Sequence, residues 1–131
     1  MTAEDDAFDD RKKSQEAKYK MEEERRFKAR SRRDKLAGLW AAGRLGLDGD
    51  AALDLAGEAV MIGFDARSDG DFATKLAERV GALGGSLRAD EIATELPRLS
   101  EEARRQIAAE FPTALDTDHR QVGDGPFARR K

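Results

Sequence analysis

Residues 27–47, with the sequence FKARSRRDKLAGLWAAGRLGL, change character halfway along a segment of helical periodicity. The first part is rich in cations. From position 36 onward the large apolar side chains recur at helical spacing, and they are Leu36, Leu39, Trp40 and Leu47. Such a face is wide enough to pack in a core, so Leu36, Leu39 and Trp40 are predicted structural core residues. We therefore expect a helix that is solvated upstream and anchored in a core downstream.

The charged segment 11–35 favours a helix that lies outside any core. It contains neither Gly nor Pro, and it carries twelve basic and five acidic residues. Pairs of glutamate with a lysine or arginine four residues later each contribute about 0.2–0.5 kcal/mol, which is too little to hold an isolated helix fully formed. Asp9 or Asp10 is a suitable N-cap, and residues 1–7 show no periodicity. The sequence predicts a mobile, partly helical N-terminal arm over residues 1–20.

Two further apolar stripes predict the next two helices. Asp48 is a good N-cap for a helix over residues 49–66. Its predicted inward stripe is Leu53, Ala56, Val60 and Phe64. Gly57 lies on the same face, which suggests a close approach to a neighbouring helix. Ser68 or Asp69 can cap the following helix, which runs to about residue 83. The predicted stripe of that helix is Phe72, Leu76, Val80 and Leu83.

A fourth stripe contains a proline. Ser86 is a suitable cap for this helix, and the residues predicted to face inward are Leu87, Ile92, Leu96, Leu99, Ala103 and Ile107. Pro97 removes a backbone donor and would cost about 3 kcal/mol in a straight helix, so we expect a kink or break there. Pro112 is predicted to end the helix.

The helical stripes together predict the fold class. No segment shows the alternation of apolar and polar residues that is typical of a strand. We predict an all-α protein, a small antiparallel four-helix bundle with a protruding N-terminal helical arm and a disordered C-terminal tail. The bundle spans residues 21–111 and the tail spans residues 112–131.

The residue types offer little for catalysis or metal binding. The chain has no cysteine, and its one histidine, His119, lies in the predicted tail. Asp65, Asp69 and Asp71 resemble part of a calcium loop, but the terminal Glu is missing. No catalytic, cofactor-binding or metal-binding residue is therefore predicted. The chain has no long apolar run and an N-terminus unlike a signal peptide, so we expect a soluble intracellular protein without membrane insertion.

The basic residues between positions 25 and 35 could neutralise the phosphates of a nucleic acid. However, the cations occupy every face of the predicted helix, aromatic residues for stacking are scarce, and the net charge of the chain is −3. A solvated helix surface with salt bridges accounts for the same run, and electrostatics alone lacks specificity. A DNA or RNA partner is therefore not expected.

Several blocks of the sequence resemble a known family. These blocks are FDDR at residues 8–11, EAK at residues 16–18, and FKA–RR–KL–GLWAA–LGL across residues 27–47. They are similar to the zeta-type inhibitor subunit of the F-type ATP synthase of alphaproteobacteria. The resemblance runs without a gap over residues 8–47 and more loosely to about residue 107.

The resemblance implies a non-enzymatic inhibitor of ATP hydrolysis that uses no cofactor. Its N-terminal arm would insert into a catalytic interface of the synthase head, which is built from alpha, beta and gamma subunits. The residues of the arm that would contact this partner are Phe8, Asp9, Asp10, Arg11, Glu16, Ala17, Lys18 and Tyr19. The protein would be a monomer when free, and cytoplasmic, peripheral to the inner membrane through the synthase.

The arm also departs from the family pattern. Gln15 stands where the family commonly has an aromatic residue, and Lys20 and Arg25 stand where it commonly has apolar residues. Fewer apolar anchors mean less buried area, which weakens binding. An adaptor that keeps the fold without inhibiting is therefore the alternative hypothesis, and a nucleic-acid-binding module is the third.

Overall fold

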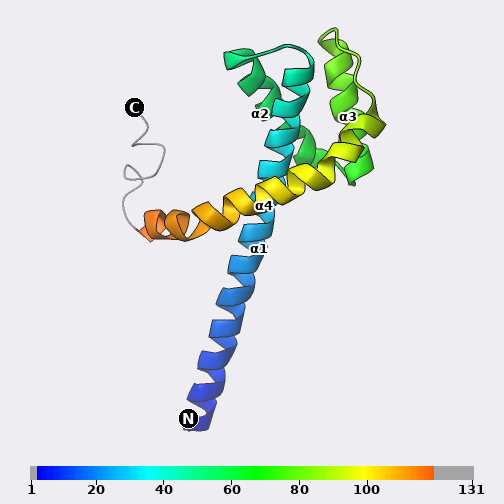
Figure 1. The fold of residues 1–131 in the computed structure, drawn as a ribbon. Coiled ribbons are helices and arrows are strands. Elements are labelled where there is room, and N and C mark those ends of the chain that lie inside the picture. The colour runs from blue at the N-terminus through cyan, green and yellow to red at the C-terminus, as the bar shows by residue number, and fades with distance from the viewer. Residues whose placement is uncertain (1–2, 120–131) are drawn as a thin grey trace.

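A computed structural model of the chain describes residues 3–119, and the side-chain surroundings of residues 6–110. The described part is all α-helix without a strand, which confirms the predicted fold class. The helices are α1 (Ala3–Arg44), α2 (Gly49–Asp65), α3 (Asp69–Ala82) and α4 (Ala89–His119). Helix α1 packs against α2 and α4, and α3 packs against α4 and α2. Figure 1 shows α4 lying across α1, with α2 and α3 at the far end of α1.

Helix α1 is one continuous element of 42 residues. It begins at Ala3, so the predicted start at a cap on Asp9 or Asp10 is wrong. The physical reason is that residues 3–37 contain neither Gly nor Pro, and acidic residues near the N-terminus meet the positive end of the helix dipole. All described side chains from residue 6 to residue 27 are exposed. The first half of α1 therefore projects from the bundle as a helical arm (Figure 1).

The core face of α1 is made of small residues. Ala37, Ala41 and Ala42 are fully buried, whereas the predicted core residues are only partly buried. These three predicted residues are Leu36, Leu39 and Trp40. Leu36 and Trp40 pack against the edge of the core cluster. The prediction was based on the largest side chains. The face of α1 that meets α2 instead carries the smallest ones, because the two backbones come close there.

Gly38 makes this close approach possible. A Cβ atom at this position would lie 2.6 Å from the Cα of Ala56 and 2.8 Å from the Cβ of Ala59, both in α2. The predicted role of Gly57 in a close approach is wrong, because Gly57 is exposed and no atom lies within 4 Å of its potential Cβ position. The glycine that admits the neighbouring helix is thus on α1 rather than on α2.

The buried stripe of α2 is rotated relative to the prediction. Of the four residues predicted to face inward, Ala56 is buried and Val60 is partly buried, whereas Leu53 and Phe64 are 57% and 55% exposed. The other buried residues of α2 are Leu55 and Ala59. Ala56 and Ala59 of α2 face the glycine of α1, and with this face inward Leu53 and Phe64 lie on the exposed side. The ring of Phe64 stacks on that of Phe27 of α1, with centroids 6.0 Å apart.

Helix α3 follows its predicted stripe. Phe72, Leu76 and Val80 are buried, and only Leu83, at 44% exposure, lies outside the core. The predicted cap is also present, since the Ser68 hydroxyl accepts a hydrogen bond from the Asp71 amide at 3.1 Å.

Helix α4 confirms the predicted inward stripe but not the predicted breaks. All six predicted residues are buried, and they are Leu87, Ile92, Leu96, Leu99, Ala103 and Ile107. The helix passes Pro97 without a break, and it also passes Pro112 to end at His119. Pro97 lies on the exposed side, where water can bond the carbonyl group that loses its partner. The predicted tail is therefore helical up to His119, and residues 120–131 lie outside the described residues.

None of the four described helices combines the length and the apolar character that crossing a membrane requires.

Candidate functional site

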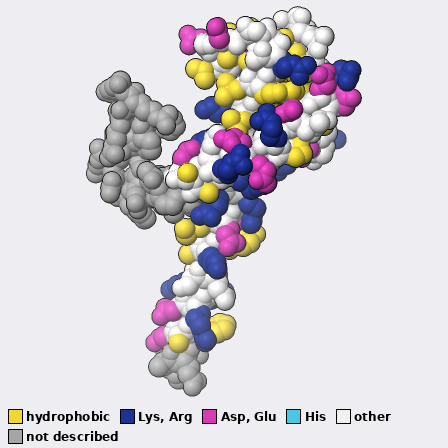
Figure 2. Space-filling model, in the orientation of Figure 1, with side chains coloured by type: hydrophobic (Ala, Val, Ile, Leu, Met, Phe, Trp, Pro, Cys, Tyr) yellow, Lys and Arg dark blue, Asp and Glu magenta, His cyan; other side chains and the backbone are white. Residues whose placement is uncertain are grey.

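The arm carries the residues predicted to bind a partner, and the structure leaves all of them exposed. They are Phe8, Asp9, Asp10, Arg11, Glu16, Ala17, Lys18 and Tyr19. Phe8 is 61% exposed and Tyr19 is 62% exposed, so most of each aromatic surface is in contact with solvent. Figure 2 shows apolar patches separated by charged side chains along this part of the molecule.

The helix brings only some of these residues to one side. Phe8 and Tyr19 are eleven residues apart, which places them within about 20° of each other around α1 and about 16 Å apart along its axis. Ala17 lies on the opposite side from Phe8 by the same helical geometry. The structure therefore presents two aromatic side chains on one face of the arm, with the charged residues distributed around it.

Polar contacts of α1 with the other helices lie where the arm meets the bundle, a region we call the root of the arm (residues 25–34). Arg32 donates to Gln106 at 2.7 Å and to both carboxylate oxygens of Glu110 at 2.7 and 2.8 Å. The partners belong to α4, so this arginine fixes the crossing of α1 and α4. Bidentate arginine–carboxylate pairs also fix the geometry of both side chains.

A buried ion pair lies at the same root. Arg33 Nη2 donates to Asp34 Oδ1 at 2.8 Å, and Arg33 Nη1 donates to Asp69 Oδ1 near the start of α3 at 2.8 Å. Arg33 is 8% exposed and Asp34 is 3% exposed. A Cβ atom on Gly63 of α2 would collide with the Asp34 carboxylate, so this glycine makes room for the buried charge. The ion pairs thereby link α1 to α3, and α2 approaches them closely at Gly63.

Burial and pairing act in opposite directions on these two groups. Burial raises the pKa of Asp34, although Arg33 acts to lower it. For Arg33, burial lowers the pKa, but the hydrogen bonds to Asp69 and Asp34 outweigh it and the pKa is raised. The arginine is therefore held in its charged form beside a carboxylate that is costly to bury.

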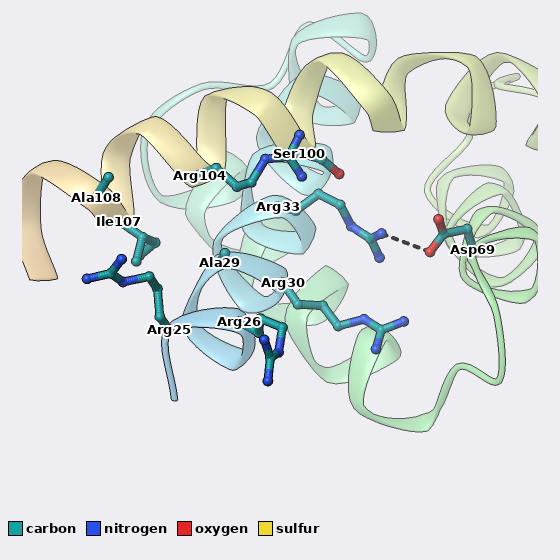
Figure 3. A pocket seen from close by; sticks show the side chains of 10 residues that line it. All are labelled: Arg25, Arg26, Ala29, Arg30, Arg33, Asp69, Ser100, Arg104, Ile107 and Ala108. Atoms are coloured by element: carbon teal, nitrogen blue, oxygen red, sulfur yellow. Dashed lines mark hydrogen bonds and ion pairs between the residues drawn. The ribbon is translucent and has the colours of Figure 1, made fainter. Parts of the chain in front are cut away.

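A pocket of about 560 Å³ opens between α1 and α4 at the root, and we call it the arginine pocket. Its basic lining residues are Arg25, Arg26, Arg30, Arg33 and Arg104. The acidic residue that lines it is Asp69, which is bound to Arg33. Ala29, Ile107 and Ala108 give it an apolar part. Figure 3 shows Ile107 reaching from α4 toward Arg25 of α1, while Arg33 reaches Asp69.

The arginine pocket was not predicted from the sequence. The basic run of α1 predicts only a solvated helix surface with salt bridges. Arg104 is 78 residues after Arg26 in the chain, and only the crossing of α4 over α1 brings them to one pocket. One sequence signal could have indicated the pocket. Arg104 directly follows the inward-facing Ala103, which places a basic residue at the border of the core.

The described side chains show no cluster suited to a metal. Among residues 6–110, no three His, Asp or Glu side chains lie together in a way that could hold a metal ion.

Comparisons with known proteins give one match. A family model described as ATPase inhibitor subunit zeta matches residues 5–106. This range contains most of the exposed arm, its root, α2, α3 and the part of α4 that reaches Gln106. No curated protein and no solved structure matches the chain.

Proposed function

Since the chain belongs to the ATPase inhibitor subunit zeta family, we propose that residues 1–20 of its projecting arm are the part that inhibits. As a member of this family the chain is a non-enzymatic inhibitor of the F-type ATP synthase. In the proposed mechanism the arm inserts into a catalytic interface between subunits of the synthase head, which contains alpha, beta and gamma subunits. Insertion there would block rotation in the direction of ATP hydrolysis, and it requires no cofactor.

The exposure of the arm is the observation that supports this proposal. A helix that buries no described side chain between residues 6 and 27 contributes no packing to its own core. An isolated helix with so few apolar residues is marginally stable in water, so a projecting segment of this kind gains most from burial in a partner. A helix that is already formed also loses less conformational entropy on docking than a disordered segment, which costs about 1–2 kcal/mol per residue ordered.

Phe8 and Tyr19 are the proposed anchors. An aromatic side chain buries about 150–250 Å², and apolar burial contributes about 25 cal/mol per Å². With 61% and 62% of their surfaces exposed, each can contribute roughly 2–4 kcal/mol on docking. Both lie on one face of α1, so one partner groove can hold them together.

The location and assembly of the protein follow from the same proposal. Binding to the head would hold the chain at the cytoplasmic side of the inner membrane through the synthase. We also propose that the bound chain contacts the alpha, beta and gamma subunits, and that the free chain is a monomer.

Deletion of residues 1–20 tests the proposal. ATP hydrolysis by the isolated synthase head is titrated with the full-length chain and with the truncated chain, and circular dichroism checks that the remaining helices stay folded. We expect inhibition by the full-length chain and none by the truncated chain. Equal inhibition by both would place the inhibitory contact on the bundle and refute the proposal.

Single substitutions sharpen this test. Phe8→Ala and Tyr19→Ala should each raise the half-inhibitory concentration by about 10- to 100-fold, as expected for 1.4–2.8 kcal/mol of lost binding. Lys13→Ala is the matched control, since Lys13 lies on the other side of α1 from Phe8. A loss as large for Lys13→Ala would show that the aromatic face is not the binding face.

One feature of the arm favours a second candidate function, an adaptor that binds without inhibiting. Gln15 is exposed and lies between Phe8 and Tyr19 on the same face by helical geometry. Lys20 and Arg25 are exposed charges on the same arm. The adaptor is distinguished by capture of the synthase head without any change in its rate of ATP hydrolysis.

A further inference from the structure

We propose that the arginine pocket binds an acidic peptide segment of the F-type ATP synthase, as a second contact beside the arm. The proposal rests on arm insertion, because insertion brings the root of the arm against the partner. The segment would carry at least two carboxylates on an extended or helical backbone. The pocket would then add to the affinity that the arm supplies, while the arm alone determines whether hydrolysis is blocked.

The charge of the pocket supports an anionic ligand. Five arginines line it, and the one acidic lining residue, Asp69, already accepts a hydrogen bond from Arg33 at 2.8 Å. The guanidinium group presents several donors in a planar fork that matches a carboxylate. A concave site lined by one sign of charge attracts the opposite charge.

The ion pairs of Arg26 and Arg104, unlike the buried pair of Arg33, are of the kind that exchange partners readily. Arg104 pairs with Glu101 one helical turn earlier, and its side chain is 60% exposed. Arg26 pairs in the same way with Glu23. Exposed pairs of this type contribute little stability. Arg30 is exposed, and its positive charge interacts with the Asp34 carboxylate. Arg26, Arg30 and Arg104 can therefore turn toward an incoming carboxylate.

The size and the apolar part of the pocket favour a peptide over a small inorganic anion. A volume of about 560 Å³ exceeds what one phosphate fills, and falls in the range of sites that hold larger ligands. Ala29, Ile107 and Ala108 can contact the aliphatic carbons of Glu side chains while the arginines bind the carboxylates.

The position of the pocket indicates the source of the peptide. The side chains of α1 change from exposed to partly buried at Lys28, which is the depth to which the arm can enter a partner. Arg25, Arg26 and Arg30 stand at this boundary, so the rim of any groove that receives the arm lies against them. The same synthase that receives the arm thus supplies the acidic segment.

Charge reversal in the full-length chain tests the proposal. Arg30→Glu and Arg104→Glu are titrated against ATP hydrolysis by the synthase head at low and at physiological salt. We expect each variant to raise the half-inhibitory concentration about tenfold, with unchanged inhibition at saturation and a weaker dependence on salt. Arg98→Glu is the matched control, because Arg98 pairs with Glu95 on α4 as Arg104 pairs with Glu101, but it does not line the pocket.

A cross-linking measurement identifies the ligand. Arg104→Lys places an amine at the pocket, and a carbodiimide joins amines to carboxylates in direct contact. Mass spectrometry of the inhibited complex should then find residue 104 linked to an Asp or Glu of a synthase subunit. Arg98→Lys serves as the control and should give no such product.

Three results would overturn the proposal. The first is an equal rise in the half-inhibitory concentration for Arg98→Glu and Arg104→Glu, which would show that the arginines act only through general electrostatic attraction. The second is self-association of the free chain that Arg104→Glu abolishes, which would make the ligand the acidic N-terminus of a second copy. The third is saturable binding of ATP or inorganic phosphate that Arg104→Glu abolishes while inhibition is unchanged. Retained inhibition after deletion of residues 1–20 would instead refute the proposal that the arm inhibits. The effect of the pocket variants on the half-inhibitory concentration would still be measured in the same titration.

Discussion

Gly38→Ala tests the close approach of α1 and α2. The added Cβ would lie 2.6 Å from the Cα of Ala56, 2.8 Å from the Cβ of Ala59 and 2.9 Å from the carbonyl oxygen of Leu55. Carbon atoms in contact normally stay about 3.5–4.0 Å apart, so the two helices would have to separate by roughly 1 Å. Backbone atoms cannot rotate away as a flexible side chain can, so the whole helix has to move.

The magnitude follows from two opposing effects. Overpacking of this kind costs about 1–3 kcal/mol, and the rigid neighbours at Gly38 place the cost near the upper value. Replacing Gly by Ala in a helix interior stabilises the folded state by about 1 kcal/mol through its higher helix propensity. The net loss in the free energy of unfolding is about 2 kcal/mol, which lowers the melting temperature of a domain of this size by about 10 °C.

Gly57→Ala is the matched control, because Gly57 lies inside α2 and no atom would lie within 4 Å of its new Cβ. This variant gains the helix propensity without the collision, so its melting temperature should rise by about 4–8 °C. The assay is thermal unfolding followed by circular dichroism, with urea unfolding as a second measurement. A rise in melting temperature for both variants would refute the close approach, and a fall for both would show that Gly57 is also packed.

Three further predictions concern the core and the charges. Leu55→Ala should lower the free energy of unfolding in urea by about 2–5 kcal/mol, whereas Leu53→Ala should cost less than about 1 kcal/mol, since Leu55 is 1% exposed and Leu53 is 57% exposed; similar losses would contradict the rotated stripe of α2. Asp34→Asn should cost about 1.5–3 kcal/mol because it removes one of the two carboxylates that pair with the buried Arg33, and an unchanged urea midpoint would show that the pair contributes nothing. The Asp71 carboxylate accepts a hydrogen bond from the Arg67 amide at 2.9 Å, which lowers the pKa of Asp71 below its usual 3.8. A carboxyl group whose pKa is lower in the folded state stabilises it above the unfolded pKa and loses this effect as the pH falls through the folded pKa. The melting temperature should therefore fall below about pH 4, and Asp71→Asn should make this fall smaller; an equally steep fall would assign it to other groups.

The parts of the fold that large side chains determine could be predicted from the sequence. The stripe of α4 is continuous on both sides of Pro97, and the stripe of α3 is a regular series from Phe72 to Val80. Among the side chains that the structure describes in these two helices, the large apolar residues are those that are buried, so periodicity alone identifies the correct face. The family blocks likewise identified the arm before its exposure was known.

The parts that small side chains determine could not be predicted in the same way. Gly38, Ala56 and Ala59 offer little apolar surface, yet they decide how α1 meets α2. A prediction based on side-chain size selects Leu53 and Phe64, and therefore places the wrong face of α2 toward the core. The arginine pocket could not be predicted for a related reason, since it depends on which helices cross rather than on any local sequence pattern.

The absence of an interruption in α1 has a mechanical consequence. A helix of 42 residues is about 63 Å long, and residues 3–37 contain no Gly or Pro that could serve as a hinge. A force applied to the tip of the arm is therefore transmitted along the backbone as by a stiff lever, and the bending moment is greatest where the lever enters the bundle. The contacts that resist it there are those of Arg32 with Glu110 and of Arg33 with Asp69. Under torque, the strength of this mounting depends on a few polar contacts at the pivot as well as on the apolar core behind them.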